Sequence, residues 1–300
     1  MSLCLAEVGV AVIGGDGRQV MVAEALSDQA AWVKVFGLAG ARTSARLFRA
    51  DSMEEALSNA RVVLLPINGV NSKGRVRSNC PHTELIIDQS FFPKLETDTL
   101  LVTGSLPSAI KSVASSFGVR IFEYAELDEI AIPNAIPTAE GAIQLMMENT
   151  GYTIDGSNCL VLGYGRVSKA LVKRLLCLGA KVTVAARNPG QRQAAVALGC
   201  GAIPLTQLAA ELKESDLVIN TIPALVLTAG IISTGAKGRS DLFLLDLASS
   251  PGGADFAVAE QAGIKALLAL GLPGKVAPKT AGKILASNLP GLIDKELNRF

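Results

Sequence analysis

The sequence predicts an α/β protein made of two Rossmann-like domains, each a doubly wound parallel sheet, with a cleft between them. Short apolar strands alternate with helical segments along the whole chain, and two of the strands run into glycine turns, at residues 14–17 and 163–165. Of the 300 residues, 49% are hydrophobic but only 4% are aromatic. Small aliphatic side chains suit close packing of helices on a sheet. A chain of this length provides two domains of ordinary size.

The net charge and the cysteine content exclude several classes of function. The formal net charge is +1, so no strong overall field attracts nucleic acid or a membrane surface. The five cysteines show no paired metal-ligand spacing, which predicts reduced thiols and no metal site. No basic segment precedes the apolar N-terminal stretch, and no apolar run is long enough to span a bilayer. We therefore expect a cytoplasmic protein.

The chain opens with a β-turn-α-β unit. Val8–Ile13 and Trp32–Phe36 read as strands, and the glycine turn and a helix stand between them. Continuous apolar runs of this kind are typical of buried parallel strands. Three later runs extend the same sheet: Arg61–Pro66, Leu100–Thr103 and Val119–Phe122. The first domain is therefore expected to cover residues 1–132.

The first glycine turn is poorly suited to a nucleotide. Asp16 would repel a phosphate, and Gly37 follows the second strand where a ribose-binding side chain is expected. Arg18, at the start of the following helix, is better suited to hold a substrate carboxylate. A solvated surface arginine is an equal alternative for Arg18.

A long loop, residues 67–81, follows the third strand. Loops of that length within a compact domain tend to be functional or mobile. Lys73, Arg75 and Arg77 either attract an anionic substrate or form a solvated charge cluster, and the solvated cluster is the commoner case. His82, the single histidine, lies just beyond the loop, where a lone histidine usually has no catalytic role.

Two prolines mark the hinge between the domains, in the segment DEIAIPNAIPTAEG at 128–141. Because proline disfavours helical geometry at the residue before it, we predict a linking helix over 138–150, inside a second domain of residues 133–278. Thr138 and Glu140 then start that helix near the substrate. The alternative for Thr138 is a simple helix cap, and for Glu140 an acid that compensates the helix dipole.

The stretch 158–188 carries the most informative motif. A strand ends at Leu162, a helix runs to about Leu178, and a second strand covers Lys181–Ala186. The turn between strand and helix is expected to bind the pyrophosphate of a dinucleotide, because a glycine allows the sharp bend and a second glycine exposes backbone amides at the positive helix end. The expected residues are Gly163, Tyr164, Gly165, Arg166 and Val167. Ser168 stands where a third Gly or Ala would allow close helix packing.

The end of the second strand favours NADP over NAD. An NAD site normally places Asp or Glu there for the ribose 2′-hydroxyl, whereas this chain has Arg187 followed by Asn188. Residues 156–210 contain no carboxylate and seven cationic side chains. That charge balance suits a 2′-phosphate. The alternative is a structural Rossmann domain with an empty crevice and a solvated basic helix face.

Other cofactor contacts are expected at the tips of neighbouring strands, because ligands bind at the carboxyl ends of parallel strands. The strands at 217–220 and 242–247 place Thr221, Ile222, Pro223 and Leu247 there. The last strand covers 264–268. The C-terminal segment 279–300, with a closing helix that ends near Leu297, is expected to pack back on the first domain.

Four regions spread over the chain resemble the family of the dipicolinate synthase A subunits of spore-forming bacteria. They are AVIGGDGRQ near the start, the hinge DEIAIPNAIPTAEGAI, the turn VLGYGRVSKA, and the closing pair LDLASSPGGADF and GIKALLALGLPGKVAPKTAG. Ser168 departs from the glycine usual in that family. The resemblance implies NADP-dependent oxidation of dihydrodipicolinate, or of its hydroxylated tetrahydro precursor, to dipicolinate. It also implies a flavoprotein-like second subunit, assembly as a homo- or hetero-oligomer, and a place in the mother cell during sporulation.

This chemistry requires alignment of two rings and binding of two carboxylates. The candidates for substrate binding are Arg18, Ser105, Thr138 and Thr280. Lys279 is the first candidate for acid/base catalysis and Glu140 the second, although a lysine at the start of an amphipathic helix is often an ordinary surface residue.

Two other functions compete with this enzyme. One is a nucleotide-binding scaffold subunit whose partner carries the chemistry. The other is a different small-acid dehydrogenase, which is disfavoured because His82 is poorly placed to serve as its acid/base.

Overall fold

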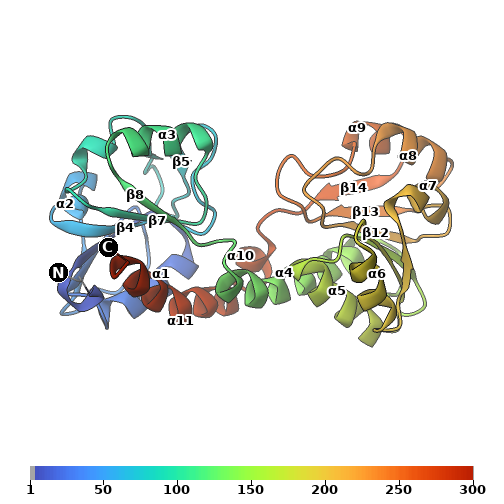
Figure 1. Cartoon of the computed structure of the whole chain (residues 1–300), viewed down its shortest axis with the longest axis horizontal. Helices are drawn as coiled ribbons and strands as arrows, with labels where there is room; N and C mark the ends of the chain where they lie inside the picture. The colour runs from blue at the N-terminus through green and yellow to red at the C-terminus, as the bar shows by residue number, and fades with distance from the viewer. Residues whose placement is uncertain (1–3, 300) are drawn as a thin grey trace. The chain divides into compact units, whose positions relative to one another are not determined.

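The computed structural model of the protein, described for residues 4–299, contains two six-stranded parallel sheets (Figure 1). Their strand orders are β3-β2-β1-β4-β7-β8 and β11-β10-β9-β12-β13-β14. In each sheet the chain builds outward from the first strand to one side and then returns to build the other side. This is the doubly wound arrangement, and it confirms the predicted fold class.

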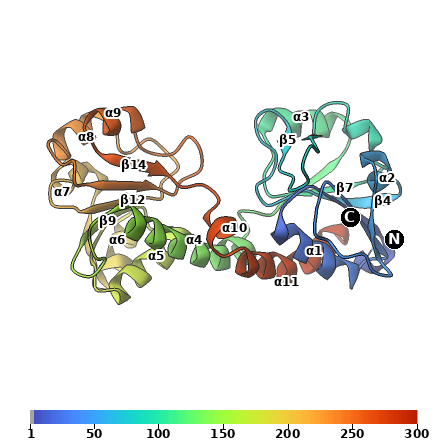
Figure 2. The same ribbon diagram turned by 180° about the vertical axis from the view of Figure 1, so that it is seen from behind.

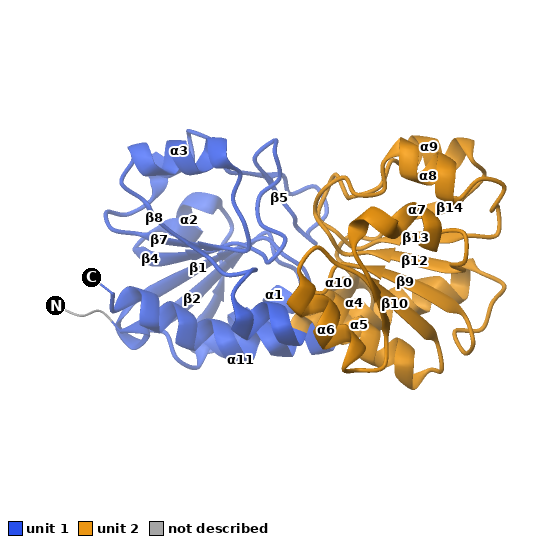
Figure 3. Cartoon of the chain, turned by 45° about the vertical axis from the view of Figure 1, so that its right-hand side comes forward, with its two compact units in different colours: residues 1–133, 278–300 blue, residues 134–277 orange. Residues whose placement is uncertain are grey.

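Two compact units divide the chain (Figure 3). Unit 1 comprises residues 1–133 and 278–300, and unit 2 comprises residues 134–277. The C-terminal segment therefore groups with the first part of the chain. In the part of the chain that the structure describes, no helix combines the length and the apolar character needed to cross a membrane.

Unit 1 is a sheet with buried strands and helices on both faces. Its central strand is buried at all five positions, which is typical of a parallel strand covered on both sides. The elements are η1 (Leu5–Glu7), β1 (Gly9–Ile13), α1 (Gly17–Ser27), β2 (Trp32–Phe36), β3 (Leu47–Arg49), α2 (Met53–Leu57), β4 (Ala60–Leu64), β5 (Arg75–Val76), β6 (Leu85–Ile86), η2 (Phe92–Lys94), β7 (Leu100–Thr103), α3 (Ser108–Ser116) and β8 (Arg120–Glu123).

The last helix, α11 (Pro278–Leu297), lies beside α1 in both views of the ribbon (Figures 1 and 2). Its buried side chains recur every four residues, as one face of a helix requires: Leu285, Leu289, Ile293 and Leu297. They join Val22 and Leu26 of α1 in one apolar cluster. The core of unit 1 is therefore completed by the end of the chain.

Unit 2 repeats the alternation of strands and helices. Separate apolar clusters fill the two faces of its sheet. The elements are β9 (Asn158–Leu162), α5 (Arg166–Cys177), β10 (Lys181–Ala185), α6 (Pro189–Val196), β11 (Gly201–Ile203), η3 (Leu205–Gln207), α7 (Leu208–Glu211), β12 (Leu217–Asn220), α8 (Ala229–Gly235), β13 (Phe243–Asp246), α9 (Phe256–Gln261), β14 (Lys265–Leu268) and α10 (Leu272–Val276).

The linking helix begins well before the position that the prolines predict. Helix α4 covers Asp128–Asn149, so the predicted start at Thr138 is wrong and Thr138 is not a helix cap. The Thr138 hydroxyl donates a hydrogen bond to the Asn134 carbonyl one turn earlier, at 2.9 Å. Each interior proline removes one helix hydrogen bond. Burial at helical spacing, at Ala135, Ala139, Ala142 and Met146, offsets that loss.

Candidate functional site

The glycine turn after β9 in unit 2 has the geometry that a dinucleotide site needs. Gly163 has φ +91°, and a Cβ there would lie 2.7 Å from the Thr221 Oγ1 atom. Any other residue would therefore be strained and crowded. Gly165 precedes α5, and a Cβ there would meet no atom within 4 Å. The backbone at Gly165 thus faces open space at the positive end of a helix, where a pyrophosphate can approach the amides.

Ser168 occupies the third position of the motif without disturbing it. The residue is fully buried, and its hydroxyl donates a hydrogen bond to the Gly165 carbonyl at 3.2 Å. A buried hydroxyl with a partner costs little. The departure from glycine at this position therefore leaves the turn intact.

The other predicted residues of the turn differ in what they offer a ligand. Tyr164 is only 4% exposed, and its side chain packs into the apolar cluster below the turn. Its hydroxyl lies 3.5 Å from the Ala194 carbonyl of α6. Tyr164 can therefore contact a cofactor through its backbone alone. Arg166 is exposed and Val167 is half-buried.

The end of β10 presents a basic side chain on a fixed backbone. Arg187 is exposed and forms no ion pair within residues 4–299. The Asn188 side chain accepts a hydrogen bond from the Gly190 amide at 2.7 Å and thereby caps α6. Arg192 donates from Nη1 to the carbonyls of Ala186 (2.7 Å) and Arg187 (2.8 Å). Sequence reasoning counted Arg192 as a cation but did not predict that it holds this strand end.

A buried polar pair fixes the tips of β12 and β13. Asp246 and Asn220 are both fully buried. The Asn220 amide donates to Asp246 Oδ1 at 2.9 Å, and the Gly253 amide donates to Asp246 Oδ2 at 2.6 Å. Asn220 Oδ1 also accepts from the Ile222 amide at 3.0 Å. Sequence reasoning missed this pair, although a polar residue ending each apolar strand was the available signal.

Of the remaining predicted residues at these tips, Thr221 and Ile222 lie beside the glycine turn, where they would contact a Cβ at Gly163. The Thr221 hydroxyl donates to the Leu162 carbonyl at 2.7 Å, which joins the end of β12 to the end of β9. Ile222 and Leu247 are half-buried and Pro223 is exposed. Unit 2 therefore brings its predicted cofactor residues together at the carboxyl edge of one sheet.

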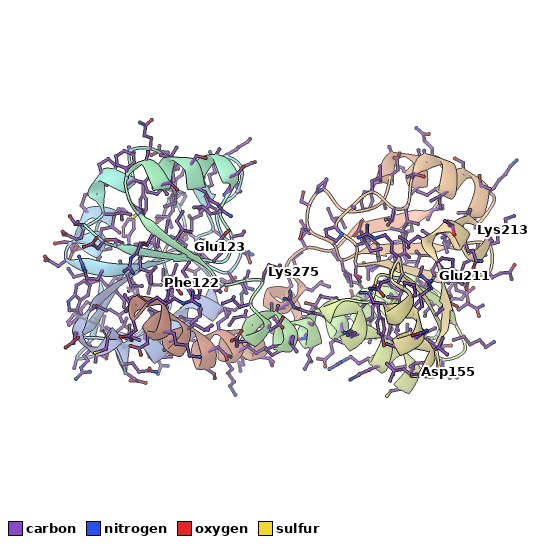
Figure 4. The ribbon with its side chains drawn as sticks, viewed as in Figure 1. Phe122, Glu123, Asp155, Glu211, Lys213 and Lys275 are labelled. Atoms are coloured by element: carbon purple, nitrogen blue, oxygen red, sulfur yellow. The ribbon has the colours of Figure 1, made fainter. Side chains whose placement is uncertain are left out.

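A cavity of about 380 Å³ lies at the opposite edge of this sheet. Its lining includes Asn158 and Lys181 at the starts of two strands and Glu211 of α7, which is labelled in Figure 4. Cys159 also faces it, and burial, together with the charge of Asp216, raises the pKa of that thiol to about 12. A thiol with so high a pKa stays protonated and unreactive. The cavity offers no chemistry of the predicted kind.

In unit 1, the turn after β1 holds an arginine against a carboxylate. Asp16 caps α1 and accepts from the Arg18 amide at 3.1 Å. The Arg18 guanidinium donates to both carboxylate oxygens, from Nε at 2.9 Å and from Nη2 at 2.8 Å. Arg18 is only 4% exposed. The alternative of a solvated surface arginine is therefore wrong.

The charge of Asp16 is stabilised by this pairing. Burial opposes ionisation, but hydrogen bonds from Arg18 and the charges of Arg18 and Arg77 outweigh it, so the pKa of Asp16 falls below its ordinary value of 3.8. Asp16 is therefore ionised near neutral pH, and it orients Arg18 as a bidentate partner.

Arg18 also connects the turn after β1 to the loop after β4, which in turn contacts the loop after β7. Its Nη2 atom donates to Asn68 Oδ1, in the loop after β4, at 3.2 Å. The neighbouring Gly69 has φ +65°, and a Cβ there would lie 2.1 Å from the Ser105 carbonyl oxygen. The loops after β4 and β7 therefore touch. Ser105 is exposed at this contact.

Glu123 at the end of β8, labelled in Figure 4, holds the loop that contains Ser105. Its carboxylate accepts from the Leu106 amide at 2.8 Å and pairs with the Lys111 ammonium group at 2.5 Å. The predicted substrate-binding residues Arg18, in the first turn of α1 after β1, and Ser105, in the loop after β7, thus follow strands that lie on either side of β4.

Helix α11 brings two more predicted residues to the same unit. Gly282 packs on α1, where an added Cβ would lie 3.3 Å from the Arg18 Cα atom. Lys279 and Thr280 lie in the turn of α11 just before this contact, and both are exposed. Within residues 4–299 neither side chain forms a hydrogen bond or an ion pair.

Glu140 has a structural partner away from the glycine turn. It lies in the interior of α4, and its Oε1 atom is 3.3 Å from the Nη2 atom of Arg174 on α5. Arg174 comes eight residues after the first residue of α5, which corresponds to about 12 Å along the helix axis. Glu140 therefore stands beside the later part of α5. Thr138 and Glu140 belong to unit 2, whereas Arg18, Ser105, Lys279 and Thr280 belong to unit 1.

Within residues 4–299, no group of three or more His, Cys, Asp or Glu side chains is arranged to hold a metal ion.

Two family models match the chain, one in each unit. The model described as the N-terminal domain of the dipicolinate synthase A subunit matches residues 9–125. The model of the NAD-binding domain of D-isomer-specific 2-hydroxyacid dehydrogenases matches residues 136–237. The second match covers the glycine turn and the basic strand end, and it marks unit 2 as a nicotinamide dinucleotide-binding domain of the dehydrogenase type.

Relatives of similar length extend the likeness over nearly all of the chain. The chain is 36% identical to the dipicolinate synthase A subunit of Bacillus subtilis (strain 168) over 287 residues, which covers 95% of each chain. A crystal structure of the dipicolinate synthase A subunit from Bacillus halodurans superposes with a TM-score of 0.89 at 36% identity, covering 97% of this chain and 99% of that one. The corresponding structure from Bacillus subtilis gives a TM-score of 0.86 at 34% identity, covering 97% and 96%.

Proposed function

The chain belongs to the family of dipicolinate synthase A subunits, and we propose that it oxidises dihydrodipicolinate, or its hydroxylated tetrahydro precursor, to dipicolinate with NADP. A dehydrogenase-type domain makes the protein an oxidoreductase. The observation that carries the proposal is the glycine turn of unit 2, with open space at Gly165 and an unpaired Arg187 at the next strand end.

The choice of NADP rests on charge. The 2′-phosphate of NADP is a dianion that a guanidinium group binds strongly. Arg187 is exposed, and its backbone is held by Arg192. In this proposal the adenosine end lies against Arg187 and Asn188, and the pyrophosphate lies on the amides of residues 163–167. Thr221, Ile222, Pro223 and Leu247 line the path towards the nicotinamide.

The reaction transfers a hydride and releases a proton. The C–H bond of a ring carbon breaks, its two electrons pass with the hydrogen to the nicotinamide, and a second ring position loses a proton as the ring becomes aromatic. NADP supplies the hydride acceptor when it is bound. The protein has to bind the two carboxylates and remove the proton.

Unit 1 supplies the groups for the substrate. Arg18, Ser105 and Thr280 are proposed to bind carboxylates, and Thr138 of unit 2 remains a further candidate. Lys279 is the preferred acid/base, because it is exposed and unpaired whereas Glu140 is held by Arg174. A lysine amine takes up a proton in its neutral form and donates one when protonated, so it also suits loss of water from the hydroxylated precursor.

A second subunit is part of the proposal. The family is named for one subunit of a synthase, which implies a partner, and we infer that this partner is the flavoprotein-like subunit of the same synthase. We also propose that the protein acts in the cytoplasm of the mother cell during sporulation, and that it assembles as a homo- or hetero-oligomer.

The test mixes the purified chain with dihydrodipicolinate and NADP and follows the absorbance of the reduced nicotinamide. We expect turnover that Lys279→Ala reduces strongly and that Lys283→Ala, one turn later on the same helix, leaves near the wild-type rate. Turnover that survives in Lys279→Ala but not in Glu140→Gln would assign the acid/base to Glu140.

The alternative is a nucleotide-binding scaffold whose partner subunit carries the chemistry. This function predicts that NADP binds but that no reduced nicotinamide forms until the partner is added. If the partner carries the chemistry, a partner subunit with an inactivated active site should fail to restore turnover. If the inactivated partner does restore turnover, the chemistry belongs to this chain.

A further inference from the structure

The loop that contains Arg77 is fixed over the carboxyl edge of the unit 1 sheet. The Gly15 amide donates to the Arg77 carbonyl at 2.6 Å. The Ser78 hydroxyl donates to the Gly37 carbonyl at 2.8 Å, and the Asn79 side chain accepts from the Ala39 amide at 2.7 Å. These bonds attach the loop to the ends of β1 and β2. Arg77 is therefore held beside the turn that contains Asp16 and Arg18.

Gly14 shows how close this attachment is. Its φ is +69°, and a Cβ there would lie 2.6 Å from the Arg77 carbonyl oxygen. A side chain at this position would push the loop away from the turn. The glycine therefore permits the backbone of Arg77 to lie directly on the β1 turn.

Arg77 brings a cation to the turn that contains Asp16 and Arg18. Its side chain is exposed and, within residues 4–299, has no ion-pair partner. Arg75, two residues earlier, is also exposed but pairs with Glu84 at 2.7 Å. The carboxylate of Asp16 is already held bidentately by Arg18. Two guanidinium groups and one carboxylate leave one positive charge at the turn.

The turn is also rich in hydrogen-bond donors. Gln19 is 1% exposed and its Nε2 atom has no hydrogen-bond partner. The side chain lies over Gly15, with Cδ 3.5 Å from the position that a Cβ of Gly15 would take. Buried donors normally have acceptors. An orphaned donor in the residue next to Arg18 indicates a place where an acceptor-rich group binds.

We propose that Arg77 binds one carboxylate of the pyridine dicarboxylate directly and that Asp16 is a positioning residue that orients Arg18 towards the same ligand. This inference rests on the proposed function and adds to it the residue that sets specificity for a diacid. A planar guanidinium group matches a carboxylate in two-point geometry. A second cation beside Arg18 would favour a diacid over a monoacid.

The test measures binding of dipicolinate to the full-length protein in the presence of NADP by calorimetry. We expect Arg77→Ala to weaken dipicolinate binding roughly 10- to 100-fold, as loss of a charge-assisted bond does. Arg75→Ala is the matched control and should stay within about twofold, because Arg75 is already paired with Glu84. Arg77→Lys should restore part of the affinity, because it keeps the charge but not the fork.

Binding of a monoacid, pyridine-2-carboxylate, is measured for comparison. It distinguishes a specific contact with the second carboxylate from a general electrostatic attraction of anions. The diacid should lose more affinity than the monoacid in Arg77→Ala. Equal losses in Arg77→Ala and Arg75→Ala, or no loss in either, would overturn the inference while wild-type binding of dipicolinate still supported the proposed function. If the wild-type protein binds NADP but no dipicolinate, the proposed substrate and this inference both fail.

Discussion

Single buried polar side chains decide much of what this protein offers a ligand. Arg18 is buried because Asp16 satisfies it, and Asp246 is buried because an amide side chain and backbone amides surround it. The sequence marks Asp246 only as a polar residue at the end of an apolar strand, and its burial depends on partners such as Asn220 from another segment. The burial of Arg18 likewise depends on the packing of the whole unit around the turn. Arg187, in contrast, could be placed from its strand and its motif alone.

Arg187→Ala is expected to weaken NADP binding far more than NAD binding, because only NADP has a 2′-phosphate to lose. Removal of a hydrogen bond to a charged group costs about 1.5–3 kcal/mol, which is roughly 10- to 100-fold in affinity. Nicotinamide fluorescence during titration with NADPH and NADH measures both constants. Lys181→Ala, at the far end of the same strand, is the control. Equal losses for the two cofactors would place Arg187 elsewhere.

Because of Asp16, the free energy of unfolding is expected to fall as the pH is lowered into the acid range. The folded-state pKa of Asp16 is lowered, so the unfolded chain binds the proton more tightly. The stability it contributes is fully present above the unfolded value of about 4 and is lost as pH falls through the lower folded-state pKa. Urea unfolding at a series of pH values should show a shallower acid limb in Asp16→Asn than in the wild type. An unchanged limb would mean that Arg18 does not stabilise this carboxylate.

At the scale of elements, the β-turn-α-β units were the most predictable part. Glycine turns, short apolar strands and a basic strand end are local signals, and the structure places them as expected. The start of α4 was not predictable in this way. Pro133 and Pro137 locally disfavour a helix, but burial of Ala139 and Met146 overrides that preference. Short elements such as β11 and α7 carry too few residues for a periodic pattern.

The two glycines of the unit 2 turn should respond differently to alanine. A Cβ at Gly165 would meet no atom within 4 Å, and the residue has an ordinary φ of −90°. The Gly165→Ala variant should therefore melt close to the wild-type temperature, but its affinity for NADP should fall because the methyl group occupies the space for the pyrophosphate. Gly163→Ala has φ +91° and a crowded site, so it should lose both stability, by about 1–3 kcal/mol, and NADP binding. Thermal unfolding and cofactor titration together test this. Unchanged cofactor affinity in Gly165→Ala would show that the turn does not bind the pyrophosphate.

At the scale of the whole molecule, the chain forms two units with separate apolar clusters. Unit 1 depends on α11, whereas unit 2 is one continuous segment. The return of the C-terminal segment to the first domain could be anticipated from the amphipathic pattern of the closing helix. The position of each side chain along that helix could not, because the register of α11 on α1 is set by close contacts such as Gly282 against Met21.

NADP should raise the unfolding temperature of one unit and not of the other. A ligand at 100 times its dissociation constant stabilises the unit that binds it by about 2.7 kcal/mol. Calorimetry should therefore resolve a transition that moves with NADP concentration and one that does not. Leu289→Ala in α11 should destabilise unit 1 by about 2–5 kcal/mol. It should therefore lower only the temperature of the transition that does not respond to NADP. A single transition that responds to both changes would show that the units unfold together.

The placement of α11 sets an order of events during synthesis. Residues 134–277 form one unbroken segment, so they can collapse as soon as they leave the ribosome. Residues 1–133 emerge earlier, yet they lack Leu285, Leu289 and Ile293 until the ribosome has made the last helix. At ordinary elongation rates this delay is on the order of ten seconds. During that interval the nascent first unit exposes the apolar face of α1, and we expect it to need chaperone protection that the second unit does not.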